Sequence, residues 1–118
     1  MTTLLVIGFD PARIPGYDPA PVLEALERGR EAYRAAGIEA TEVLVGPDGE
    51  LPRITAALTA RRYDCVLVGG GLRKPPECLE LFERVVNLVH RHAPGSVIAF
   101  GTSPVDGAEA ALRALAAA

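Results

Sequence analysis

Three short segments of the chain begin with glycine and carry side chains that could bind a small molecule. They are residues 8–10, 69–74 and 101–103. Glycine lets the backbone come close to a ligand, and the cations of Arg73 and Lys74 could neutralise an anionic group. Carboxylate and hydroxyl groups in the other two segments could orient the same molecule. These segments therefore predict a site for a small anionic molecule that carries a phosphate or a carboxylate.

The candidate ligand-binding residues come from these segments and from the connection after the first one. They are Gly8, Phe9, Asp10, Tyr17, Gly69, Gly70, Gly71, Arg73, Lys74, Gly101, Thr102 and Ser103. If the protein is an enzyme, Asp10 or Tyr17 would transfer protons and the two hydroxyl groups would position the substrate. The alternative is structural: the glycines only form a tight turn, Arg73 and Lys74 are solvated, and Asp10 pairs with Arg73.

Four runs of mostly apolar residues predict strands. They are residues 4–7, Ile38–Val45, Cys65–Val68 and Val97–Phe100. The run Cys65–Val68 is apolar at every position, which is typical of a strand in the middle of a parallel sheet with helices on both faces. The run Ile38–Val45 includes Glu39 and Glu42, which indicates a strand at an edge of the sheet.

Segments with apolar residues at helical spacing follow all four strands. They predict helices at residues 19–36, 51–62 and 76–92, and an alanine-rich helix after residue 106. Asp18 would cap the first helix, whereas Asp106 and Glu109 have the spacing of a capping box for the last. The first helix would bury one stripe, formed by Val22, Leu26, Gly29, Tyr33 and Ala36. The helix 76–92 would start beside Arg73 and Lys74 and add the positive end of its dipole to an anion site.

The succession of four strand–helix units predicts one α/β domain over residues 1–118. Right-handed crossovers favour a parallel sheet, and we expect a three-layer, flavodoxin-like (Rossmann-like) fold with strand order 2-1-3-4. In such a sheet ligands bind beyond the carboxyl ends of the strands, where the winding reverses. Here that point lies between the first and third strands, so residues 8–18 and 69–74 would form the walls of the site.

Two features favour a different function, an interaction module without catalysis. The strand Val97–Phe100 is apolar although it should lie at an edge, and the helix 76–92 has a wide apolar stripe. Either the last helix covers that strand, or two chains meet there as a homodimer. The winding also resembles that of phosphorylation receiver domains, in architecture alone. Asp10 and Thr102 lie roughly where a receiver has an acid and a hydroxyl, but Gly69 stands where its acceptor aspartate would be.

Composition and missing motifs exclude several other classes of function. A net charge of −3 argues against general binding to nucleic acid or to an anionic membrane, and no apolar run approaches the ~20 residues of a membrane helix. Without a leader sequence, we expect a cytoplasmic protein. We expect no cofactor and no metal: Lys74 interrupts the only partial dinucleotide motif, and His90 and His92 point to different sides of one helix. Cys65 and Cys78 are expected to be buried thiols.

Overall fold

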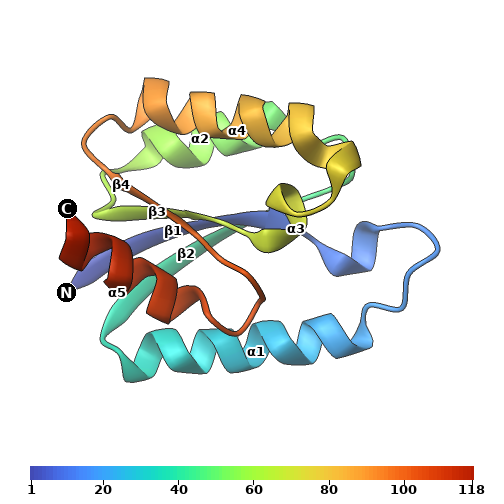
Figure 1. Cartoon of the computed structure of the whole chain (residues 1–118), viewed down its shortest axis with the longest axis horizontal. Coiled ribbons are helices and arrows are strands. Elements are labelled where there is room, and N and C mark those ends of the chain that lie inside the picture. The colour runs from blue at the N-terminus through green and yellow to red at the C-terminus, as the bar shows by residue number, and fades with distance from the viewer.

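Four parallel strands form the sheet at the centre of the protein (Figure 1). In the computed structural model, which describes residues 1–118, they are β1 (Thr2–Phe9), β2 (Ile38–Val45), β3 (Cys65–Val68) and β4 (Val97–Phe100). Their spatial order is β2-β1-β3-β4, so the predicted three-layer, flavodoxin-like α/β fold is confirmed. The strand β1 extends two residues beyond its predicted limits at each end.

Helices cover both faces of the sheet. The longer ones are α1 (Ala20–Ala35), α2 (Leu51–Ala60), α4 (Leu79–His92) and α5 (Gly107–Ala117), and the short ones are η1 (Pro11–Arg13), α3 (Gly70–Arg73) and η2 (Pro76–Cys78). Helices α2 and α4 lie on one face, whereas α1 and α5 lie on the other (Figure 1). No helix combines the length and the apolar character needed to cross a membrane.

The strand register places the three glycine-initiated segments at one edge of the sheet. Ile7 of β1 lies beside Val68 of β3, and Val68 lies beside Phe100 of β4. The next residue of each strand or segment is a glycine, so all three segments leave the sheet at the same level. The three segments therefore lie together beyond the carboxyl ends of β1, β3 and β4, next to the point between β1 and β3 where the winding of the sheet reverses.

Two hydrophobic cores flank the sheet. The core under α2 and α4 has 12 buried residues, most of them Leu, Ile and Val from the strands and from these two helices. The core under α1 and α5 has 10 buried residues, and four of them are alanines. Side chains alternate between the two faces, so Leu5 and Ile7 enter the first core while Leu4 and Val6 enter the second.

The prediction of an open glycine loop followed by a helix at 76–92 was wrong. Residues 70–73 form the short helix α3, which Leu72 anchors because its side chain is fully buried. Pro75 and Pro76 have no amide hydrogens to continue a helix, so a 3-10 turn follows and α4 begins only at Leu79. The positive end of the α4 dipole is thus farther from Arg73 and Lys74 than expected.

Other helix ends differ by one or two residues from the sequence prediction. Helix α1 begins at Ala20, and the Asp18 carboxylate accepts a hydrogen bond from the Ala20 amide at 3.1 Å. Helix α2 ends at Ala60 instead of residue 62. Gly37 has a positive φ of 71°, as expected for a glycine that ends a helix.

Candidate functional site

The floor of the candidate site is a row of glycines across the sheet. Because Val6 and Leu67 face α1, the alternation of side chains places Gly8 and Gly69 on the same face. Gly101 follows Ala99 in the same way, and Leu44 of β2 is the register partner of Gly8. Three of the four positions in this row have no side chain, so the space above the carboxyl edge of the sheet is not filled from below.

The roof of the site is the N-terminal half of α1. The C-terminal half is fixed by close packing: a Cβ atom on Gly29 would overlap the Pro104 carbonyl oxygen, and the Tyr33 hydroxyl packs against Gly107. In the first half, by contrast, Val22 and Leu26 are only half-buried. The predicted stripe is therefore buried only at Gly29 and Tyr33. Val22 and Leu26 face a hollow, and Ala36 is exposed.

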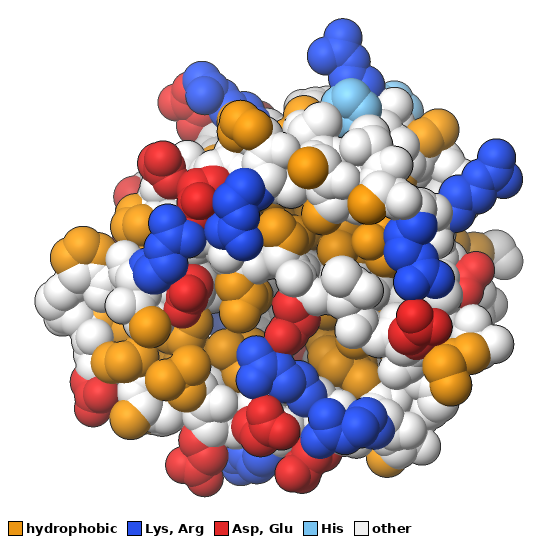
Figure 2. Space-filling view, turned by 180° about the vertical axis from the view of Figure 1, so that it is seen from behind, with side chains coloured by type: hydrophobic (Ala, Val, Ile, Leu, Met, Phe, Trp, Pro, Cys, Tyr) orange, Lys and Arg blue, Asp and Glu red, His pale blue; other side chains and the backbone are white.

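Floor and roof enclose a cavity of about 810 Å³, which we call the crevice. Its inner surface is mostly apolar, with Val6, Val22, Leu26, Leu44 and Leu67 between α1 and the sheet. Ile14 and Tyr17 from the connection before α1 lie on one side, and hydrophobic side chains gather at this end of the molecule (left of Figure 2). The volume is in the range of pockets that bind small molecules.

Ten of the twelve predicted site residues line the crevice, and two do not. Those that line it are Gly8, Phe9, Tyr17, Gly69, Gly70, Gly71, Lys74, Gly101, Thr102 and Ser103. The Asp10 carboxylate instead accepts a hydrogen bond from the Ala12 amide at 3.0 Å and caps η1. The Arg73 guanidinium donates from Nη2 to the Gly101 carbonyl at 2.9 Å, while its buried Nε has no partner. The Asp10–Arg73 pair that the structural alternative required is absent, because the two side chains bond to different backbone groups.

The three glycines after β3 act through close approach and not through unusual torsion angles. None of them has a positive φ. A Cβ atom on Gly70 would lie 3.0 Å from the Thr102 carbonyl oxygen, and one on Gly69 would lie 3.3 Å from the Ile7 carbonyl oxygen. Gly70 and Gly71 are the first two residues of α3, so their amides have no acceptor within that helix. These two N–H groups lie at the mouth of the crevice with the Lys74 ammonium, which donates to the Thr102 carbonyl at 2.8 Å.

The amides of the third segment are already occupied by a carboxylate of the protein. Asp106 accepts hydrogen bonds from the amides of Thr102 and Ser103, at 3.1 and 3.2 Å, and from the Thr102 hydroxyl. Burial raises the pKa of the Asp106 carboxyl, but these hydrogen bonds outweigh burial and leave that pKa below its usual value. The expected capping box with Glu109 is therefore wrong: Asp106 makes no side-chain cap to α5 and stabilises the wall of the crevice.

Similarity to known proteins gives no guide to the crevice. The sequence matches no known protein family, and no curated protein is significantly similar to it. The function of the crevice has to be inferred from the residues that line it, from their burial and from their charges.

Sequence reasoning missed several lining residues. Glu42 is on β2 and faces α1, with Ile38, Ala40 and Leu44 on the same side by alternation. A charged residue at an inward position of a strand could have been recognised from this period of two. Cys78 lines the crevice and is half-buried, not fully buried as expected. Burial and the neighbouring Glu77 raise the pKa of the Cys78 thiol, which makes it a weak nucleophile.

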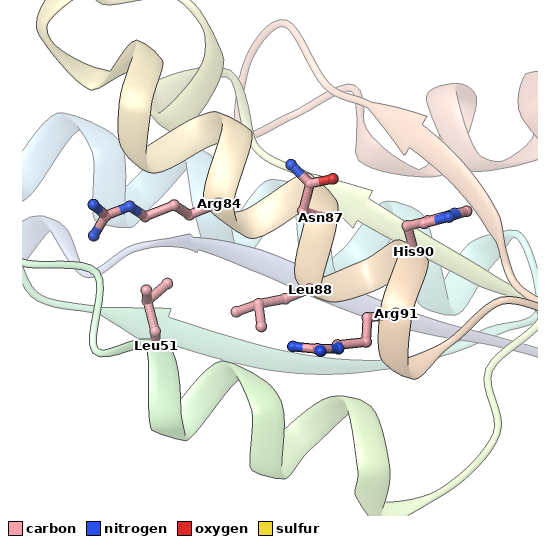
Figure 3. A pocket seen from close by; sticks show the side chains of 6 residues that line it. All are labelled: Leu51, Arg84, Asn87, Leu88, His90 and Arg91. Carbon is pink, nitrogen blue, oxygen red and sulfur yellow. The ribbon is translucent and has the colours of Figure 1, made fainter.

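A second hollow, of about 640 Å³, lies between α2 and α4 (Figure 3). Its six lining residues are Leu51, Arg84, Asn87, Leu88, His90 and Arg91. Four of these are exposed polar or charged side chains from one helix, and Arg84 already donates to Glu80 at 2.7 Å. All six belong to helices, and none comes from the strands or the glycine-initiated segments. No group of three metal-binding side chains occurs anywhere in the structure. The crevice is thus the better candidate site.

Proposed function

We propose that the protein binds a small molecule with an apolar body and one anionic end, a carboxylate or a phosphate, in the crevice. The observation that carries this proposal is the crevice itself, an apolar hollow over a glycine row with Lys74 as its single lining cation. Pockets with mostly apolar walls and few polar groups are typical small-molecule sites. The apolar body would lie between α1 and the sheet, and the anionic end would lie at Lys74 and the free amides of Gly70 and Gly71.

Most of the affinity would come from the apolar part of the ligand. Burial of each methylene group contributes about 0.8 kcal/mol, whereas an exposed charge pair contributes about 0–1 kcal/mol. The Lys74 ammonium is exposed at the mouth. Its role would be to orient the ligand and to favour acids over neutral molecules of the same shape.

The geometry supports binding better than catalysis. The Thr102 hydroxyl donates to Asp106, but a carboxylate with a lowered pKa is a poor general base. Of the two predicted acid–base residues, Asp10 caps η1 outside the crevice, whereas Tyr17 lines it and has no base beside it that forms a hydrogen bond with it. The raised pKa of Cys78 keeps that thiol protonated. We therefore assign no chemical step to the crevice.

The test is titration of the protein with straight-chain monocarboxylates from butanoate to decanoate, and with alkyl phosphates and alcohols of the same lengths. Calorimetry should show an affinity for the acids that rises about fourfold per methylene until the crevice is full. Gly8→Val should abolish binding of the longer acids, because a Cβ at Gly8 meets only Leu44, at 3.6 Å, and the valine methyls would fill the floor without a clash. Lys74→Gln should remove the preference for acids over alcohols.

Two control variants separate these effects from general damage. Gly95→Ala adds a methyl group where nothing lies within 4 Å, and Arg84→Gln removes a cation from the hollow between α2 and α4. Both should bind the acids like the unaltered protein. If no acid or phosphate binds the unaltered protein, or if Arg84→Gln weakens binding as much as Lys74→Gln, the proposal is wrong.

A second candidate function, dimerisation, is supported by the free edge of β4. The amides of Val97 and Gly101 donate to β3, so the alternate residues Ile98 and Phe100 direct their amides and carbonyls away from the sheet. Phe100 is 36% exposed, and Leu112 of α5, a helix that contacts β4, is 45% exposed. The Phe100 carbonyl already accepts from Arg113 at 3.5 Å, but two copies could pair their β4 strands antiparallel, which would give partners to the other edge groups and cover both side chains.

Sedimentation over a range of protein concentrations tests this second candidate. A dimer should form at high concentration, and Phe100→Lys should abolish it because a cation would replace the apolar contact. Leu23→Lys is the matched control, because Leu23 is an exposed leucine on α1 and not on β4. A monomer at all concentrations would refute the pairing and leave the ligand proposal untouched.

We place this function in the cytoplasm. Cys65 and Cys78 are both unpaired thiols, and a reducing compartment keeps thiols in that state. Localisation of a fluorescent fusion would test the assignment.

A further inference from the structure

The inner end of the crevice holds an unpartnered phenol. Tyr33 lines the crevice, and only 5% of its surface is exposed. Its hydroxyl packs against Gly107 and forms no hydrogen bond within the protein, but it is not sealed from solvent and faces the crevice. A ligand group that reaches this end of the crevice could therefore bond to the hydroxyl in place of solvent.

A carboxylate oxygen lies at the same end of the crevice. Glu42 is in the strand row of Val6 and Leu67, one step inward from the glycine row and so roughly 6–7 Å farther from the mouth. Arg30 binds one carboxylate oxygen, Oε1, through Nε and Nη2, both at 2.9 Å. No group of the protein donates to the other oxygen, Oε2. The side chain of Glu42 is 20% exposed and lines the crevice, so Oε2 is available to a ligand.

Tyr33 keeps its proton at any ordinary pH and so can donate a hydrogen bond. Burial, together with the nearby charge of Glu42, raises the pKa of Tyr33 to about 12. The inner end therefore offers one phenol donor and one carboxylate acceptor. A hydroxyl group is the smallest ligand group that matches both, because its oxygen accepts from Tyr33 while its proton is donated to Glu42. A second anionic group would face the charge of Glu42 and be repelled.

We propose that the ligand of the crevice carries a hydroxyl group at the end that enters first, and that Tyr33 and Glu42 select this group against both a bare hydrocarbon end and a second acid. This inference rests on the proposed function, because it assumes that an apolar acid occupies the crevice with its anionic end at Lys74. The ligand class is thus an apolar hydroxy acid with a single negative charge.

The experiment compares three ligands of equal chain length: an alkanoate, its terminal hydroxy derivative and the corresponding dicarboxylate. The eight-carbon set is octanoate, 8-hydroxyoctanoate and octanedioate, and sets from six to ten carbons allow for the unknown span. In the best set the hydroxy acid should bind about threefold to tenfold more tightly than the alkanoate, as one net hydrogen bond implies. The dicarboxylate should bind most weakly.

Two variants test the separate roles of Tyr33 and Glu42 in selecting the hydroxy acid. Tyr33→Phe should remove the about threefold to tenfold preference for the hydroxy acid and leave octanoate binding unchanged. The unfolding midpoint of the ligand-free variant should not fall, because the lost hydroxyl has no partner in the protein. Glu42→Gln should admit the dicarboxylate, with about a tenfold gain, because the repelling charge is removed.

The outcomes separate this inference from the function on which it rests. If octanoate binds but the hydroxy acid is not preferred at any chain length, or if Tyr33→Phe keeps the preference, the inference is overturned and the binding proposal stands. If Glu42→Gln does not improve dicarboxylate binding, the assigned role of Glu42 is wrong. If no member of any set binds, the proposed function itself fails.

Discussion

The two faces of the sheet differ in how fully helices cover them. Under α2 and α4 the side chains of Leu5, Ile7, Val66 and Val68 are fully buried along the whole strand length. Under α1 the packing is dense only toward the amino ends of the strands, and a row of glycines leaves a cavity of about 810 Å³ at the other end. One sheet therefore has a face that stabilises the fold and a face with room for a ligand.

The difference arises from how the covering helices are held. Helix α5 contributes the buried alanines 108, 110 and 111, whose small side chains let it pack close to the sheet. Helix α1 contacts the same layer through Gly29 and Tyr33, both in its C-terminal half. The N-terminal half of α1 extends beyond those contacts, and the crevice lies between this half of the helix and the sheet.

The largest contrast is expected between equivalent leucines under the two faces. Leu58→Ala, at a position 2% exposed between α2 and the sheet, should lower the free energy of unfolding by about 2–5 kcal/mol, because it opens a cavity in a packed core. Leu26→Ala on α1 should cost only about 1 kcal/mol, because that side chain already borders the crevice. Urea unfolding of both variants measures the difference. Equal costs would mean that α1 packs as tightly in solution as α2.

A smaller effect should follow from releasing the fixed point of α1. Gly29→Ala places a methyl group against the Pro104 carbonyl and should destabilise the protein by about 1–3 kcal/mol. Gly95→Ala, in open space, is the control and should be nearly neutral. The Gly29 variant should also change acid binding, since the roof of the crevice would shift. If thermal unfolding finds both variants alike, Gly29 does not fix the helix.

The smallest effect concerns the wall of the crevice and depends on pH. Asp106→Asn should cost about 1 kcal/mol at neutral pH, because it weakens the hydrogen bonds from Thr102 and Ser103. Since the folded pKa of Asp106 is lowered, its stabilisation is complete above the ordinary carboxyl pKa and is lost as the pH falls through the folded value. The two proteins should thus converge in acid.

Asp48→Asn, in the turn before α2, is the control for the pH experiment, because Asp48 accepts only one long hydrogen bond, from Glu50 at 3.3 Å. Unfolding of all three proteins across the acid range gives the comparison. A constant difference between Asp106→Asn and the unaltered protein down to the lowest pH would show that the charge of Asp106 does not stabilise the wall.

The sequence determined the sheet well because the relevant signals are local. Uninterrupted apolar runs predicted Cys65–Val68 and Val97–Phe100 with the bounds that the structure has, and the mixed run Ile38–Val45 was correctly placed at an edge. Short connections and the handedness of crossovers then fixed the strand order. The order in turn brought the three glycine-initiated segments to one edge. Helix starts near proline were less certain, and α4 began three residues later than predicted.

The content of the site was decided only by the tertiary structure. Arg73 and Asp10 looked like a charged pair at the site, but each binds a backbone group supplied by the folded chain. Asp106 looked like a helix cap, yet it holds the Thr102 segment. The crevice exists because Gly29 meets Pro104, residues that are far apart in the sequence. Local patterns record which side chains prefer burial, whereas distances between remote segments determine which polar groups are engaged and where space remains.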